Sequence, residues 1–431
     1  MWKRSGSSLL ATGLAACLVQ SSIWAGDAKV LKEPVVAAAS SLHRDISPRR
    51  VEGMLRAVAE DMHLAPGDVP RVEVLPDYEL DRRAHALLRA QGQRVNLFER
   101  NASLKRIGLL LPGDDLSIDL MVDLPSSVGG LYDPVSESIF IRESLPGENQ
   151  DEVIYHELVH LLQHRHYRDV REKVGNHLDE DHARAVRAVM EGHAVSVATH
   201  LTGIERQGTR LRSFFGRTSQ VPEVLALVDF EDQTTVPVIP HLSGSRLFSL
   251  GARFVEVFER FYGENLASLY ESPPISTEQL LHFKRYAQGE KPADATIANL
   301  GDRLSGDWDI CDVFTMGEFN TALWLGREPG SDGALGWNGD QLISFRSAKG
   351  KHITGWRTLW DTDADAVEFF ESAQERFERR FGRGSRQEIV GGGVFYVQGG
   401  EGFGLVRNGR EVRILAGADA LVLPDLLMGS W

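Results

Sequence analysis

Cysteine is almost absent from this chain of 431 residues, which contains only two, Cys17 and Cys311. Cys17 lies in an N-terminal segment that we expect to be either removed or acylated, so Cys311 is the only free thiol that remains. A disulfide within the mature chain is then impossible, and the stability of the fold must come from its core. A free cysteine is usually buried as a small apolar residue, and we expect this for Cys311.

An excess of basic residues is missing as well. Lysine and arginine number 47 against 61 aspartates and glutamates, the net charge is −14, and no stretch forms a basic stripe. This balance argues against nucleic acid and against an anionic membrane surface as partners, because both attract positive charge. A peptide or protein substrate stays open. The apolar content of 42% and the charged content of 25% are ordinary for a globular protein.

No apolar run is long enough to span a membrane. The N-terminal run at residues 9–19 is well short of the roughly 20 residues required, and it follows a positively charged start. This combination is typical of a signal peptide, which we place at residues 1–26. Residues 14–17 fit a lipobox in which Cys17 is acylated, and ordinary cleavage after Ala25 is the alternative. Either way we expect export, to the periplasm or the medium, with membrane contact only through the signal peptide or a lipid anchor.

The most informative stretch is residues 151–166, which contains the sequence His-Glu-Leu-Val-His beginning at His156. In a helix, residues four apart lie almost above one another, so His156 and His160 can converge on one metal ion. Glu157 is rotated by about 100° from the first histidine and can reach a water on that ion. The other residues of this helix are mostly apolar, which predicts burial. Buried histidines need partners, and a metal ion supplies them.

A catalytic zinc site needs a third protein ligand. Glu191 is the favoured candidate, because it lies on a second, alanine-rich helix where an unpaired carboxylate would be costly to bury. His166 has the metzincin spacing, but Gln163 stands where that motif has the glycine that lets the chain turn. The remaining alternative is an acidic residue such as Asp179 or Asp181.

His-Glu-x-x-His followed by a glutamate on the next helix resembles the gluzincin group of zinc metallopeptidases, of which thermolysin is a familiar member. The likeness is closest to poorly characterised exported proteins of bacteria and archaea, which share an edge strand before the motif and a Glu-Gly pair at the third ligand. It covers roughly residues 129–370. The resemblance implies a zincin-like core in which His156, His160 and Glu191 hold Zn²⁺ and Glu157 is the general base.

The resemblance also implies a histidine or tyrosine in the downstream half that donates a hydrogen bond to the oxyanion formed during hydrolysis. His282, on a short helix that we predict to be capped by Ser276, is our candidate for this role. His241 is the other option, and a structural histidine bonded to backbone is the simpler interpretation of His282. Phe248 stands where the related proteins often have tyrosine, so a hydroxyl is missing at that position.

The whole chain predicts an α+β fold, with a zincin-like metallopeptidase core, a C-terminal helical region and a small β-meander. We expect a flexible leader at 27–47, the catalytic domain at 48–292, a helical extension at 293–385 and the meander at 386–431. Apolar alternation and turn residues predict strands at 71–75, 107–111 and 116–122, a hairpin at 129–142 and a hairpin turn at Asn408-Gly409. Helical periodicity predicts helices at 48–63, 81–90, 180–201, 247–262, 307–325 and 363–381. Asn149 and Glu152 fit a capping box at the start of the helix that contains His156.

Together these features predict an exported zinc metallopeptidase that hydrolyses peptide bonds. The alternative is a zincin-like protein that keeps its metal but acts in binding or envelope assembly, since fold does not imply function. Phe248 favours this alternative. The intact Glu157 favours the enzyme, because a purely structural zinc site has no need of a general base.

Overall fold

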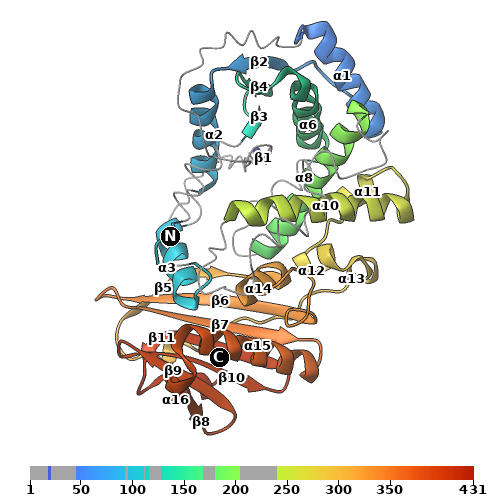
Figure 1. The fold of residues 1–431 in the computed structure, drawn as a ribbon. Coiled ribbons are helices and arrows are strands. Elements are labelled where there is room, and N and C mark those ends of the chain that lie inside the picture. Colours follow the sequence, from blue (N-terminus) through green and yellow to red (C-terminus); the bar gives the residue numbers. More distant parts are fainter. Residues whose placement is uncertain are drawn as a thin grey trace, which may run out of the picture.

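The computed structural model describes residues 18–20, 45–92, 96–110, 112–115, 128–167, 180–203 and 240–431. Most of the predicted signal peptide and leader, and the strand predicted at 116–122, lie outside these ranges. No helix in the described ranges is both long enough and apolar enough to cross a membrane. The fold is α+β, as predicted. Figure 1 shows one sheet at each end of the molecule, with α8 and α10 between them.

The first sheet has four strands in the order β1-β3-β4-β2. β3 (Val128–Asp133) and β4 (Ser138–Arg142) form an antiparallel hairpin, and β2 (Arg71–Leu75) runs parallel to β4. These elements confirm the predicted strand and hairpin. The short strand β1 (Leu18–Gln20) pairs antiparallel with the other side of β3. It lies within the segment that the sequence predicts to be a signal peptide.

Helices cover both faces of this sheet. α1 (Pro48–Asp61) and α6 (Gly147–His166) share a core with side chains of β3 and β4, while α2 (Asp77–Gly92) packs on the opposite face. The predicted capping box of α6 is wrong. The helix begins at Gly147 after Pro146, whose φ of −55° already suits a helix start, so Asn149 lies inside the first turn and caps nothing.

α8 (Glu180–Thr202) crosses α10 (Pro240–Tyr262) at two glycines. A Cβ on Gly192 would lie 2.1 Å from the backbone carbon of Gly251, and a Cβ on Gly251 would lie 1.7 Å from the carbonyl oxygen of Ala188. The two backbones therefore touch next to Glu191. α8 ends before Gly203, which has a φ of 71°, as the sequence predicts.

The second sheet contains seven antiparallel strands in the order β5-β6-β7-β11-β10-β9-β8. The strands are β5 (Trp308–Phe314), β6 (Trp337–Ser347), β7 (His352–Trp360), β8 (Gln387–Ile389), β9 (Gly393–Gln398), β10 (Glu401–Asn408) and β11 (Glu411–Asp419). The predicted division into a helical extension and a separate meander is therefore wrong. β5, β6 and β7 come from the supposed extension, and β7 pairs directly with β11 of the supposed meander.

Two local predictions in this half also fail. The helix predicted at 307–325 is β5 followed by α14 (Gly317–Leu325), because Gly317, at the start of α14, has a φ of 74° that a continuous helix does not allow. The strand predicted at 107–111 does not form in its described part: α3 (Leu97–Ile107) ends there, Gly108 terminates it at a φ of 82°, and residues 108–110 form a turn. The helix predicted at 363–381 is confirmed as α15 (Asp363–Phe381). The hairpin predicted between β10 and β11 is also confirmed, but its turn lies one residue later than predicted, at Gly409 and Arg410, because Asn408 still belongs to β10 and pairs with Glu411.

Aromatic side chains fill the core on one face of the second sheet. Trp324 of α14 packs edge-on against Trp356 of β7, and Phe369 of α15 lies against both rings. α3 covers the same face, although it precedes the first sheet's hairpin in the chain. The opposite face is covered by α16 (Leu423–Met428) and by the chain around Leu300. Between the sheets lie the short helices α11 (Ala267–Glu271), α12 (Thr277–Leu281) and α13 (Phe283–Gln288).

Candidate metal centre

The side chains of His156, His160 and Glu191 converge where α6 meets α8. The two Nε2 atoms are 2.9 Å apart, and Glu191 Oε2 lies 3.4 Å from His156 Nε2 and 3.5 Å from His160 Nε2. All three residues are at most 3% exposed. Two donors bound to one tetrahedral zinc at 2.0–2.1 Å must be about 3.3 Å apart. The three atoms therefore have the spacing and the chemistry of a zinc-binding set, and Glu191 is the candidate that the fold brings to the two histidines.

The alternative third ligands lie elsewhere. His166 Nε2 is 2.8 Å from the carbonyl of Ala65 at the surface, and the carboxylate of Asp181 accepts from the amide and hydroxyl of Thr277. Asp179 lies outside the described residues. His164, which extends the row of histidines, contacts the hydroxyl of Tyr132 at 2.7 Å instead.

Burial sets the protonation of the ligands. It lowers the pKa of His156 to about 4, so this imidazole is neutral at pH 7 and can offer a lone pair. Burial alone would raise the pKa of Glu191, but the adjacent His160 and His156 outweigh it and hold that pKa below its usual range. A neutral imidazole and an ionised carboxylate are the forms that bind a metal ion.

Glu157 is fully buried beside these ligands. Burial raises the pKa of its carboxyl group to about 8, and the nearby Glu191 adds to this, while His160 and the backbone of Tyr132 act in the opposite direction. Apart from the contact with the backbone of Tyr132, neither carboxylate oxygen has a hydrogen-bond partner among the described residues. A carboxyl group with a raised pKa and free oxygens can both accept and release a proton near neutral pH.

Gln163, one helical turn after His160, orients that imidazole. Its Oε1 lies 2.8 Å from His160 Nδ1, and its Nε2 donates to the carbonyl of Met190 at 2.9 Å and to the hydroxyl of Tyr270 at 2.8 Å. A carbonyl can only accept, so Met190 fixes the orientation of the amide, and Gln163 Oε1 must accept from His160 Nδ1. The lone pair of His160 is therefore on Nε2, the atom that faces the other two ligands.

Tyr270 extends this network to α8. Its hydroxyl accepts from Gln163, so its own proton goes to His193 Nδ1 at 2.7 Å. Burial lowers the pKa of His193 to about 3, so the ring is neutral and its Nδ1 can accept this proton. The ring of Tyr270 stacks on Tyr167 with 4.0 Å between centroids. Side chains from α6, α8 and α11 thus hold the orientation of His160, one of the three candidate metal ligands.

Sequence reasoning missed this network. In the sequence, Gln163 stands out only as the residue that replaces the glycine of the metzincin motif. The usable signal was the position of Gln163, three residues after His160 on an otherwise apolar helix, where a buried amide needs partners on the same face.

The structure places His282 at the start of α13, with its Nε2 2.8 Å from Glu318 Oε1 of α14. In the described part of the chain this carboxylate is its hydrogen-bond partner, and its role as an oxyanion donor stays a prediction. Ser276 caps α12 as predicted, because its hydroxyl accepts from the amide of Gln279. His241 lies in the first turn of α10, and its side chain is outside the described set. Phe248 is part of the apolar core around α8 and α10.

Comparisons with known proteins cover only the C-terminal part. Residues 311–427 match the family model described as Domain of unknown function (DUF8575). No curated protein matches the chain, and no solved structure matches it. The matched stretch runs from β5 to α16, so it includes most of the second sheet and none of the three convergent ligands.

Proposed function

We propose that this protein is an exported zinc-dependent peptidase with a zincin-like core of gluzincin type. His156, His160 and Glu191 would hold the ion, and Glu157 would act as the general base. Zinc, when bound in such a set, lowers the pKa of a coordinated water to about 7 and polarises a carbonyl group. Glu157 takes a proton at its carboxylate and delivers it to the nitrogen that leaves when the peptide bond breaks.

The observation that carries the proposal is the free carboxylate of Glu157 beside three convergent ligands. A buried carboxyl group without partners costs stability, so a site that only binds metal would gain from an apolar residue there. Its proximity to Glu191 and its raised pKa suit a group that shuttles a proton.

A peptide substrate is supported by strand β3. Its outer side pairs antiparallel with Leu18–Gln20, which is the way an extended peptide adds to a sheet edge. The backbone of Tyr132 on this strand lies close enough to Glu157 to lower its pKa. Cleavage after Ala25 would remove the covering strand and leave this edge free next to the general base.

The test compares metal content and hydrolysis in purified residues 27–431. We expect Glu191→Ala to contain one zinc ion less per chain than the wild type. Glu157→Gln should keep its zinc but lose hydrolysis of a peptide library, read by mass spectrometry of new termini, by about 10²–10⁴-fold. Asp307→Asn, an exposed carboxylate elsewhere, is the matched control and should change neither.

A chelator should abolish the hydrolysis, and added zinc should restore it. Hydrolysis that persists in Glu157→Gln would refute the assigned base. Zinc that stays at wild-type levels in Glu191→Ala would refute the ligand set. Full zinc binding without turnover of any peptide would favour the non-catalytic alternative, which the absence of a hydroxyl at Phe248 and the engagement of His282 by Glu318 also support.

A further inference from the structure

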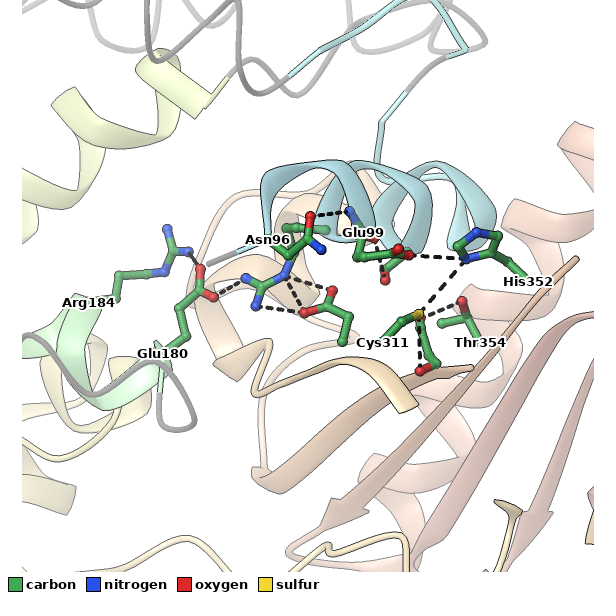
Figure 2. A network of polar contacts seen from close by, with 11 residues as sticks. Asn96, Glu99, Glu180, Arg184, Cys311, His352 and Thr354 are labelled. Atoms are coloured by element: carbon green, nitrogen blue, oxygen red, sulfur yellow. Dashed lines mark hydrogen bonds and ion pairs between the residues drawn. The ribbon is translucent and has the colours of Figure 1, made fainter. Parts of the chain in front are cut away.

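A second group of side chains of the types that bind metal ions lies where α3 packs on the second sheet (Figure 2). Glu99 comes from α3, Cys311 from β5 and His352 from the first position of β7. His352 Nδ1 lies 4.0 Å from Cys311 Sγ and 3.6 Å from Glu99 Oε2. One donor atom from each of the three residues lies within 4.8 Å of the others.

A β-bulge directs the thiol into this group. Ile310 pairs with Phe345 and Asp312 pairs with Ser344, so Cys311 between them has no ladder partner on β6, and its thiol lies 3.4 Å from the carbonyl oxygen of Ser344 on that strand. A bulge of this kind re-aims a side chain and is common beside functional sites. The sequence predicted a buried apolar cysteine, and this is wrong, because Cys311 is only half-buried and faces polar atoms.

One carboxylate oxygen of Glu99 faces the imidazole of His352. The residue is 2% exposed, and its Oε1 lies 2.9 Å from a guanidinium nitrogen of Arg346. Its Oε2, which faces His352, is buried and has no hydrogen-bond partner in the described structure. An oxygen that is both buried and unsatisfied is costly, and its position indicates a missing partner.

Two simpler interpretations do not account for this geometry. A hydrogen bond between nitrogen and oxygen requires about 2.7–3.2 Å, and the 3.6 Å between His352 and Glu99 exceeds that range. A Cys-His-Glu catalytic triad would use one ring nitrogen for the thiol and the other for the carboxylate. Here the same atom, Nδ1, faces both groups, so the three side chains converge on a common point.

We propose that Glu99, Cys311 and His352 form a second binding site for a thiophilic divalent metal ion such as zinc. A tetrahedral zinc would place sulfur and nitrogen about 3.6 Å apart, and nitrogen and oxygen about 3.3 Å apart. The observed distances of 4.0 and 3.6 Å are slightly longer, so a small inward movement of the side chains closes the site. Cys311 loses its thiol proton to solvent when sulfur binds the metal.

This site would join α3 to two strands of the second sheet. The adjoining contacts already serve that purpose, since Arg100 of α3 pairs with Asp312 of β5 and with Glu180 at the start of α8 (Figure 2). A metal ion held from α3, β5 and β7 would therefore stabilise the junction between the two halves of the molecule. The site lies on other elements than the proposed catalytic centre and does not depend on it.

Cobalt substitution tests the proposal, because a cobalt–thiolate bond gives a charge-transfer absorption band in the near ultraviolet that histidine and carboxylate ligands do not. Residues 27–431 contain a single thiol, so such a band would report Cys311 alone. We expect the band in the wild type and in Glu191→Ala, where the other centre is disabled. The band should be absent in Cys311→Ser. In His352→Asn and Glu99→Gln, the cobalt affinity read from the band should be at least tenfold weaker than in the wild type.

Two outcomes of the cobalt experiment would overturn the proposal. One is a cobalt-loaded wild type without the thiolate band. The other is a wild-type cobalt affinity in both His352→Asn and Glu99→Gln, since the thiol would then bind the metal without help from the imidazole or the carboxylate. A thermal unfolding measurement provides a second readout: added zinc should raise the melting temperature of Glu191→Ala, and this increase should vanish when Cys311→Ser is added. An equal increase in both would also contradict the proposal.

Discussion

Replacing Gln163 with leucine should weaken zinc binding without removing any ligand. The variant loses three hydrogen bonds of a side chain that is 0% exposed, and it frees the imidazole of His160 to rotate or change its tautomer. Loss of such a partner behind a metal ligand typically costs 10–100-fold in metal affinity. The carbonyl of Met190 and the Nδ1–H of His160 each lose a hydrogen bond inside the core, at about 1–3 kcal/mol each. The metal-free protein should therefore also unfold about 2–6 kcal/mol more easily.

The assay is competition with a zinc chelator at pH 7, in a Cys311→Ser background so that only this centre is measured, together with denaturant unfolding of the metal-free protein. Gln288→Leu, at an exposed position that ends α13, is the matched control and should change neither quantity. Tyr270→Phe removes one bond of the amide and keeps the other two, so its affinity loss should be smaller. A folded Gln163→Leu that binds zinc with the wild-type dissociation constant would refute the orienting role of the amide.

Three further changes test the packing and the buried charges. Gly251→Ala should destabilise the protein by about 3 kcal/mol in denaturant unfolding, because its Cβ would lie 1.7 Å from the carbonyl of Ala188. Asp340→Asn should cost about 3 kcal/mol or more, since each carboxylate oxygen accepts from one backbone amide and one indole, and an amide nitrogen would face two donors. Burial raises the pKa of Asp181 from 3.8 to about 8, so the folded protein keeps a proton that the unfolded chain releases. The free energy of unfolding should therefore fall as pH rises from about 4 to about 8. Asp181→Asn should remove this pH dependence.

The first two changes have matched controls in the chain, and the third has an outcome that would contradict it. Gly53→Ala, in the interior of α1 with nothing within 4 Å of the added Cβ, should stabilise by about 0.5–1 kcal/mol, and equal effects of both glycine variants would contradict the close helix contact. Asp307→Asn at the surface should stay within about 0.5 kcal/mol of the wild type. Parallel stability curves for wild type and Asp181→Asn between pH 4 and pH 8 would show that this carboxyl group is not protonated in the fold.

The parts of the fold that could be predicted from sequence depend on neighbours close in the chain. The spacing of His156 and His160 on one helix face, and the stop at Gly203, are fixed by residues within two turns. Glu191 could also be predicted, because an acidic residue inside an apolar helix needs a specific partner wherever that partner comes from. The hairpin turn after Asn408 is similar, since β10 ends and β11 begins directly beside it.

The second sheet could not be predicted in this way. β7 pairs with β11, whose partner residues are more than 50 positions away, and nothing in the sequence of either strand specifies the other. β7 places Trp356 and Trp360 in the aromatic core and Ile353 on the opposite face, so it is buried on both sides and lacks a clear alternation of apolar and polar residues. Without that alternation, local sequence patterns between residues 308 and 360 predict a helix and none of the three strands.

The same distinction separates the two metal-binding groups. His156, His160 and Glu191 carry their signal in spacing, since two of them lie on one turn of helix and all are surrounded by apolar residues. Glu99, Cys311 and His352 have no such spacing, because α3, β5 and β7 meet only when the second sheet has formed. Each of the three has an ordinary interpretation by itself: a helix carboxylate, a small core residue and a strand histidine. Their chemistry becomes visible only through the bulge at Cys311 and the unsatisfied oxygen of Glu99, so a site of this kind has to be found from the buried polar atoms of a structure rather than from a motif.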